Sequence, residues 1–192
     1  MGTWKFDPMH LQVEFSAKHL GMMTVRGHFT EVTATGDLYP DQPERSKVDV
    51  SINTASIRTH NEQRDNDLRA SYFLEVDKYP TITFKSTKIE AKSKDKGTLT
   101  GDLTIKGVTK PVTLDVVRYG EFNDPAMGHR IAFAAETKIN RQDYNMKFDA
   151  VLDGKFVVSH EIEINIEGEL LEAQEPATAG SSPKGKDDRA TP

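Results

Sequence analysis

The side chains best suited to chemistry in this sequence are its histidines, because the chain contains no cysteine. No two histidines lie three or four residues apart, so no pair would share a helical turn as many metal sites require. The sequence also carries no phosphate-binding glycine loop, no nucleophile elbow and no zinc-protease helix motif. We therefore expect no catalytic residue, no metal ion and no cofactor. The six histidines are His10, His19, His28, His60, His129 and His160.

Two positions could meet a polar group of a ligand. His19 continues the alternation of Val13 and Phe15, which directs it inward at the end of a strand. There it could contact a ligand headgroup, or it could hydrogen-bond the carbonyl of a loop. Arg64 and Asp65 stand at the start of a helix, where an anion is well placed. The alternative for this pair is an Arg–Asp network that pins the helix to the fold.

Residues 54–86 are the one stretch with a helical pattern. Thr59 and Glu62 have the spacing of a capping box, in which each side chain satisfies a backbone donor at the helix start. A Tyr-Pro pair at 79–80 ends any helix. Three residues follow the cap at intervals of four, which places them on one helical face: Arg64, Leu68 and Tyr72. The pattern predicts a short helix that acts as a lid or plug on a fold built from strands.

The rest of the chain alternates apolar and polar residues with a period of two, as half-buried strands do. Nearly all the connections are short enough for hairpins, which favours an antiparallel up-and-down barrel. We expect an all-β domain over residues 1–172 and a disordered tail over 173–192, which is rich in Ala, Pro, Gly, Ser and charge. The eight expected strands start near Trp4, Val25, Val48, Ile82, Leu99, Val112, Ile131 and Ile162.

Charge and hydropathy exclude several classes of protein. The formal net charge is -5, and basic residues are scattered among acidic ones. Nucleic-acid binding, which needs a basic face, and a stable polybasic membrane anchor are therefore not expected. No apolar run approaches the ~18 residues that a spanning helix needs. The first residues lack the pattern of a secretory signal, so we expect a cytoplasmic protein, or a periplasmic or secreted one if the chain is a trimmed mature form.

The pattern leaves open whether the barrel is filled or hollow. The inward positions carry bulky apolar residues interrupted by small ones, namely Ala17, Gly27, Gly101 and Ala135. Side chains can fill an eight-stranded barrel, or the barrel can hold one small ligand. Strands of about ten residues would be ~33 Å long, longer than a compact core requires.

Several blocks, taken in order and spacing, resemble those of the YceI-like family, a lipocalin-like group associated with polyisoprenoid binding. The resemblance covers residues 4 to about 171. Asp67 departs from it, because family members often carry His at that position. The matching blocks are W-x-F-D-x-x-H at 4–10, residues 55–59 with Arg64-Asp65, residues 79–86, residues 101–112 and Ile-Asn-Arg-Gln-Asp-Tyr at 139–144.

The resemblance implies a lipocalin-like eight-stranded antiparallel barrel with a short helix over one end and an apolar pore. It implies a non-enzymatic carrier of a polyisoprenoid, prenyl quinone or fatty-acid derivative, and we leave a homodimer open. The alternative is a filled barrel that acts in stress as a structural or interaction module. The lumen residues expected are Val13, Phe15, Phe29, Val50, Ile52, Phe84, Leu103, Leu114 and Phe133, with Leu68, Tyr72 and Phe73 as the lid. The headgroup candidates are His19, Arg64 and Arg141.

Overall fold

The computed structural model describes residues 3–173, which form twelve strands, one α-helix and three 3-10 turns. The predicted tail thus lies, apart from its first residue, outside the described residues. The helix α1 spans Glu62–Arg69, and the 3-10 turns span Pro43–Arg45, Thr54–Ser56 and Arg141–Tyr144. The strands are β1 (Thr3–His19), β2 (Met23–Phe29), β3 (Val32–Asp37), β4 (Lys47–Asn53), β5 (Ile57–Arg58), β6 (Thr81–Ala91), β7 (Lys96–Ile105), β8 (Val108–Asp124), β9 (Gly128–Asn140), β10 (Val151–Leu152), β11 (Lys155–Phe156) and β12 (Glu161–Ala173).

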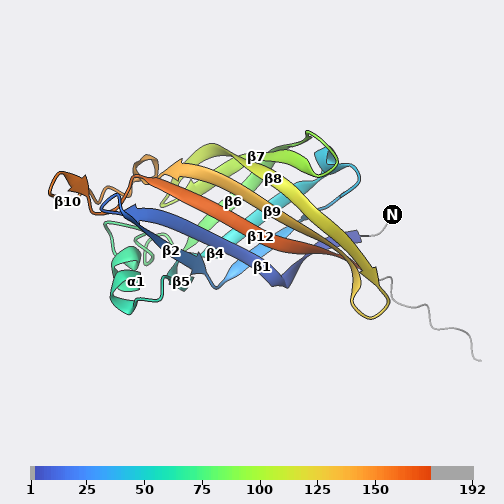
Figure 1. Cartoon of the computed structure of the whole chain (residues 1–192), viewed down its shortest axis with the longest axis horizontal. Coiled ribbons are helices and arrows are strands. Elements are labelled where there is room, and N and C mark those ends of the chain that lie inside the picture. Colours follow the sequence, from blue (N-terminus) through green and yellow to red (C-terminus); the bar gives the residue numbers. More distant parts are fainter. Residues whose placement is uncertain (1–2, 174–192) are drawn as a thin grey trace, which may run out of the picture.

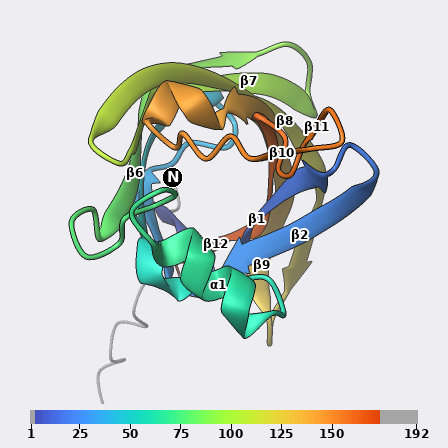
Figure 2. The same cartoon turned by 90° about the vertical axis from the view of Figure 1, so that its left-hand side faces the viewer.

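Ten of the strands form one antiparallel sheet in the order β3-β4-β6-β7-β8-β9-β12-β1-β2-β5. The sheet curls back on itself, and Trp4 of β1 forms an antiparallel bridge with Leu38, just beyond β3. The long strands run along the longest axis of the molecule, and α1 lies at one end of them (Figure 1). Viewed toward that end, the strands surround the axis as a ring (Figure 2). The prediction of an all-β antiparallel barrel-like fold is confirmed.

The strand count differs from the eight predicted because one predicted strand is divided and short strands are added. The second predicted strand contains both β2 and β3. Between them, the N–H groups of Thr30 and Glu31 donate to the carbonyl and the hydroxyl of Ser56, at 3.2 and 3.1 Å. In a regular ladder these two N–H groups would donate to a neighbouring strand. Here they donate to the 3-10 turn that follows β4, which interrupts the strand. The strand β5 and the β10–β11 hairpin, both two residues per strand, were not predicted.

Three shifts of register affect which side chains face the interior. In β1 the pairing with β12 shifts between Phe6 and Leu11, and in β6 the pairing with β7 shifts between Ser86 and Lys88. In β8 the pairing with β9 shifts between Arg118 and Gly120. A bulge adds one residue to one strand, which exchanges the inward and outward positions beyond it. In β6 the interior side therefore passes from even-numbered to odd-numbered residues.

The helix starts differently from the predicted capping box. The N-cap is Asn61, whose side chain accepts from the N–H of Arg64 at 2.9 Å, and α1 ends at Arg69. The prediction of Thr59 as the cap was therefore wrong, because Asn61 sits closer to the first helical residue in an extended conformation and reaches the free N–H. Tyr72 lies beyond the helix rather than on its face. No helix in residues 3–173 has the length and apolar character required to cross a membrane.

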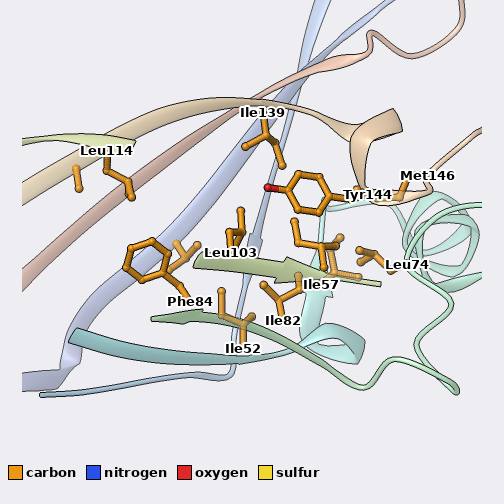
Figure 3. Close-up of a cluster of buried hydrophobic side chains, with 13 residues drawn as sticks. Ile52, Ile57, Leu74, Ile82, Phe84, Leu103, Leu114, Ile139, Tyr144 and Met146 are labelled. Carbon is orange, nitrogen blue, oxygen red and sulfur yellow. The ribbon is translucent and has the colours of Figure 1, made fainter. Parts of the chain in front are cut away.

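The most tightly packed apolar side chains gather toward the helix end of the barrel. Figure 3 shows Leu74 and Ile57 from the segments around α1 meeting Tyr144 and Met146 from the segment after β9. Tyr144 and Ile57 are each 2% exposed. Further along the barrel the same cluster continues into side chains from the strands, which the close-up labels as Ile52, Ile82, Phe84, Leu103 and Leu114.

Candidate functional site: an apolar cavity inside the barrel

A cavity of about 720 Å³ runs through the interior of the curled sheet. Along β9 its lining extends from Ile131 to Ile139, which corresponds to ~26 Å of strand. Most of its lining residues are aliphatic or aromatic, and they come from both halves of the barrel. Its volume lies within the ~300–1,000 Å³ typical of small-molecule sites, which are also concave and mostly apolar. The barrel is therefore hollow, and the question that the sequence pattern left open is answered.

All twelve residues predicted for the lumen and its lid line this cavity. Their role in binding a ligand stays a prediction. Several of them are also part of the packed core, since the most buried ones are at most 9% exposed and contact one another. The twelve are Val13, Phe15, Phe29, Val50, Ile52, Leu68, Tyr72, Phe73, Phe84, Leu103, Leu114 and Phe133.

The lining also includes residues that the sequence analysis did not select. On β12 the apolar side of the alternation, Ile162, Ile164 and Ile166, faces the cavity. Their period of two was visible in the sequence and could have identified them. Ile89 of β6 also lines the cavity, but it lies beyond the bulge, on the side that simple alternation places outside.

An aromatic cluster borders the cavity at the helix end. The rings of Tyr72 and Phe73 lie 5.7 and 5.1 Å from the ring of Phe148, measured between centroids. Tyr72 donates a hydrogen bond to Asp67 at 2.8 Å, and this bond raises the pKa of the phenol. Leu68 of α1 also lines the cavity here. The segment after α1 and the segment after β9 thus meet over the same end of the barrel.

Arg64 lines the cavity, but its guanidinium group is engaged within the fold. It donates from Nε to the hydroxyl of Thr59 at 2.8 Å and from Nη2 to the Thr59 carbonyl at 2.7 Å. Asp65 binds the same residue, so the two side chains converge on Thr59 instead of pairing with each other. The network that pins the helix therefore exists, with Thr59 at its centre.

His19 also lines the cavity, at the same end. Its Nδ1 lies 2.9 Å from the carbonyl oxygen of Val157, so this nitrogen carries the hydrogen and donates. Of the two roles considered for His19, the bond to a loop carbonyl is present. The exposed side chain keeps its other ring nitrogen for a further partner.

Arg141 is 1% exposed and holds together the segment between β9 and β12. Its guanidinium donates to the carbonyls of Met146 and Phe148, both at 2.6 Å, and to those of Ser159 and Val158, at 3.0 and 3.2 Å. It also pairs with Asp149 at 3.3 Å. Burial lowers the pKa of Arg141, and the nearby Asp149 charge opposes this shift. The guanidinium N–H groups of Arg141 that a headgroup would need are therefore engaged by contacts within the fold.

The opposite end of the cavity is lined by charged residues of both signs that were not predicted from the sequence. Glu90, Lys94, Asp95, Lys96 and Arg118 all contribute to the lining there. Arg118 forms an ion pair with Glu121, and its main-chain N–H donates to the Asp95 carbonyl at 2.9 Å. The β6–β7 turn lies beside β8 in the folded sheet, which brings these charged side chains together in a way that linear spacing does not indicate.

A cluster of Asp7, His10 and Glu169 on β1 and β12 has the composition of a metal site, since its ligand atoms lie within 4.8 Å of one another. Arg130 pairs with both of its carboxylates, with Nη1 at 2.7 Å from Glu169 and hydrogen-bonded to Asp7. The hydrogen bonds from His10 and Arg130 lower the pKa of Asp7 to about 2, although burial opposes the shift. The cluster is an ion-pair network that fastens β1 to its neighbours.

The curled antiparallel sheet and its interior define an all-β protein of the barrel class with an apolar cavity. A family model for the YceI-like domain matches residues 4–170. Protein YceI of Shigella flexneri is 42% identical over 143 residues, which is 74% of each chain. The chain belongs to the YceI-like family, and the resemblance seen in the sequence is confirmed.

Two solved structures illustrate the likeness. A YceI protein of Campylobacter jejuni superimposes with a TM-score of 0.72 at 35% identity, covering 82% of this chain and 90% of that one. A polyisoprenoid binding domain from Saccharophagus degradans, implicated in plant cell wall breakdown, gives a TM-score of 0.63 at 14% identity, covering 90% of this chain and 100% of that one. The first resembles this chain in sequence and fold, and the second in fold alone.

Proposed function

We propose that this protein binds a long apolar molecule, a polyisoprenoid or a similar amphiphilic lipid, inside the barrel. The observation that carries the proposal is the cavity of about 720 Å³, elongated along the strands and lined mostly by apolar side chains. A narrow apolar lumen fits a chain-like ligand better than a compact polar one. The fold shared with a polyisoprenoid binding domain supports the same class of ligand.

Binding would be driven by removal of apolar ligand surface from water. Each 100 Å² removed contributes about 2.5 kcal/mol, before the loss of ligand freedom is subtracted. The lining contains several preformed aromatic contacts, such as Phe15 with Phe29, whose ring centroids are 5.8 Å apart. A lumen held open by strands requires little rearrangement when a ligand enters, which keeps the cost of binding low.

Polar groups stand at both ends of the lumen and would orient a headgroup. At the helix end His19 is the most available of the three candidates, because its side chain is exposed and only its Nδ1 is used by the bond to Val157, whereas Arg141 is buried and the guanidinium group of Arg64 donates to both oxygens of Thr59. At the other end Arg118 is paired with Glu121, and Lys94 and Lys96 lie among Glu90 and Asp95, so a polar headgroup would meet charges of both signs there. We propose a carrier role without catalysis, in which the residues of the lumen bind the ligand and do not transform it.

The decisive experiment is to purify the protein from its native source and analyse an organic extract by mass spectrometry. We expect one prenyl or acyl lipid per protein molecule. Absence of a stoichiometric lipid, together with failure to load polyprenyl or acyl lipids in vitro, would refute the proposal. The alternative, a structural or interaction module that acts through its surface, would then be favoured, although the filled interior first considered for it is contradicted by the cavity.

A matched pair of variants tests whether the lumen is the site. Phe133→Lys places a charge in the cavity, and we expect it to abolish lipid loading while the barrel stays folded, because the cavity leaves room for the side chain and water. Ala134→Lys is the control, since Ala134 faces the other side of β9 and pairs across the strands with Glu167. If Phe133→Lys unfolds the protein instead, Phe133 belongs to a packed core.

A further inference from the structure

Most of the large exposed apolar side chains form two groups, and the larger one surrounds the helix end of the cavity. Met22 in the β1–β2 turn and Met23 at the start of β2 are each 66% exposed, and Leu152 in the β10–β11 hairpin is 61% exposed. Monomeric soluble proteins rarely expose contiguous apolar patches of large size unless the patch meets a partner. We name this group the apolar rim and define it as Met22, Met23, Tyr72, Val151, Leu152 and Phe156.

Three separate segments supply the rim, and main-chain bonds hold two of them together. The N–H of Leu20 donates to the carbonyl of Val157 at 3.2 Å, and the N–H of Ser159 donates to the carbonyl of Lys18 at 2.9 Å. These bonds fix the β1–β2 turn beside the β10–β11 hairpin. The third segment, which carries Tyr72, is joined to the same region by the ring of Phe148.

The hairpin carries part of the rim beyond the barrel. In Figure 1, β10 projects past the ends of the long strands on the side of α1. In Figure 2, which faces this end, β10 and β11 lie near the β1–β2 turn. The two turn residues, Asp153 and Gly154, both have positive φ, as a tight two-residue hairpin turn requires. Val151 and Phe156 pair directly across the hairpin and share one face, whereas Leu152 pairs with Lys155 on the other face, so the projecting hairpin carries exposed apolar side chains on both faces.

The rim is continuous with the lumen. Met23 and Tyr72 are exposed to solvent and also line the cavity, and Phe148 and Val157 line it just behind them. An apolar path therefore runs from the outer surface into the barrel. Charged residues line the cavity at both ends. Lys18, Arg64 and Asp67 lie at this end, and Glu90, Lys94, Asp95, Lys96 and Arg118 lie at the other.

We propose that the apolar rim docks the helix end of the barrel on the surface of a lipid bilayer. A bilayer is the partner that an apolar rim around an apolar lumen fits, because a lipid can then pass between the two without crossing water. This reasoning rests on the proposed lipid-binding function, whereas the docking itself can be measured without any ligand. The rim is too short to span the membrane and would enter only the interfacial region.

Charges around the rim are mixed, so electrostatic attraction contributes little. Lys18, Lys147 and Lys155 are exposed beside it, and Asp153 stands at the hairpin turn. Asp149 pairs with Arg141 and His160. We therefore expect binding to depend mainly on the apolar side chains, with a modest preference for anionic lipid.

The test measures co-sedimentation of the full chain with phosphatidylcholine vesicles and with mixed phosphatidylcholine–phosphatidylglycerol vesicles. The test variant is Met22→Ser with Leu152→Ser, two exposed rim residues that do not line the cavity. Its matched control is Phe122→Ser with Met127→Ser, which removes two exposed apolar side chains near the opposite end. We expect the rim variant to lose about tenfold in vesicle affinity and the control to bind like the unchanged protein.

Three outcomes would overturn the proposal: no binding by the unchanged protein, an equal loss in both variants, or a dimer in light scattering that the rim variant dissolves. The last result would assign the rim to a second copy of the chain. Loading of a fluorescent fatty-acid probe in vesicle-free solution is measured in parallel. If vesicle binding holds while no lipid or probe enters the barrel, the docking surface stands and the lipid-carrier function fails.

Discussion

One carboxylate oxygen of Asp65 accepts hydrogen bonds from both the main-chain N–H and the hydroxyl of Thr59, at 2.8 and 2.6 Å. Asp65 is in the first part of α1, and Thr59 follows the short strand β5. Both are almost fully buried, at 5% and 2% exposed. Arg64 donates to the hydroxyl and carbonyl oxygens of the same threonine, and Arg69 donates to the carbonyls of Ala55 and Ile57, so these bonds together hold α1 over the barrel end.

Replacing Asp65 with Ala should therefore destabilise the protein by about 2 kcal/mol, since a buried main-chain donor would lose its partner. Urea unfolding followed by circular dichroism measures the change. Glu62→Ala is the control in the same helical turn, because Glu62 is exposed, and we expect a change of ~0.5 kcal/mol or less. Equal effects of the two substitutions would contradict the role given to Asp65.

Arg141→Met should destabilise the protein by about 3 kcal/mol or more, because four carbonyl groups and Asp149 lose a buried partner. Amide hydrogen exchange should show faster exchange in residues 145–160 than in the strands. A headgroup role predicts the reverse: reduced lipid loading with unchanged unfolding and exchange. The two readouts therefore distinguish the structural role of Arg141 from ligand binding.

His129 should stabilise the fold more at low pH than at high pH. Its Nδ1 lies 2.7 Å from Glu172 and its Nε2 is hydrogen-bonded to Glu121, and these bonds raise the pKa of His129 above its usual 6.5. The contribution of His129 to the free energy of unfolding is complete at pH values below its unfolded-state pKa. It is lost as the pH rises through its folded-state pKa.

The measurement compares the unfolding free energies of the unchanged protein and His129→Gln at pH values of about 6 and 9. We expect the difference between the two proteins to be larger at the lower pH by about 1 kcal/mol, because the group is partly exposed and solvent weakens the pairs. A difference that is constant over this range would show that the ion pairs do not contribute to stability.

Gly101→Ala should destabilise the protein by about 2 kcal/mol, because a β-carbon there would overlap the ring of Phe84 and the carbonyl oxygen of Lys85. Phe84 lines the cavity, so its displacement should also alter lipid loading. Gly120→Ala is the matched strand control, since no atom of residues 3–173 other than those of its chain neighbours lies within 4 Å of the added carbon. Thermal unfolding of both variants checks the prediction, and similar melting temperatures would contradict it.

The sequence by itself determined the all-β architecture, the short helix between strands and the apolar side of most strands. These features follow from local periodicity, since a period of two places alternate side chains on opposite faces of a strand. That is why residues as far apart as Val13 and Phe133 could both be assigned correctly to the interior. The family could also be inferred, because the order and spacing of several residue blocks along the chain match those of the YceI-like family.

Only the tertiary structure decided that the interior is hollow and where its charged groups lie. Periodicity identifies inward positions but does not specify the distance across the barrel, so a cavity and a filled core have the same pattern. The bulge in β6 moved Ile89 inward against simple alternation. From the sequence, Arg141 could have bound a ligand or the main chain. The outcome depended on carbonyls up to eighteen residues away, which folding brought within hydrogen-bonding distance.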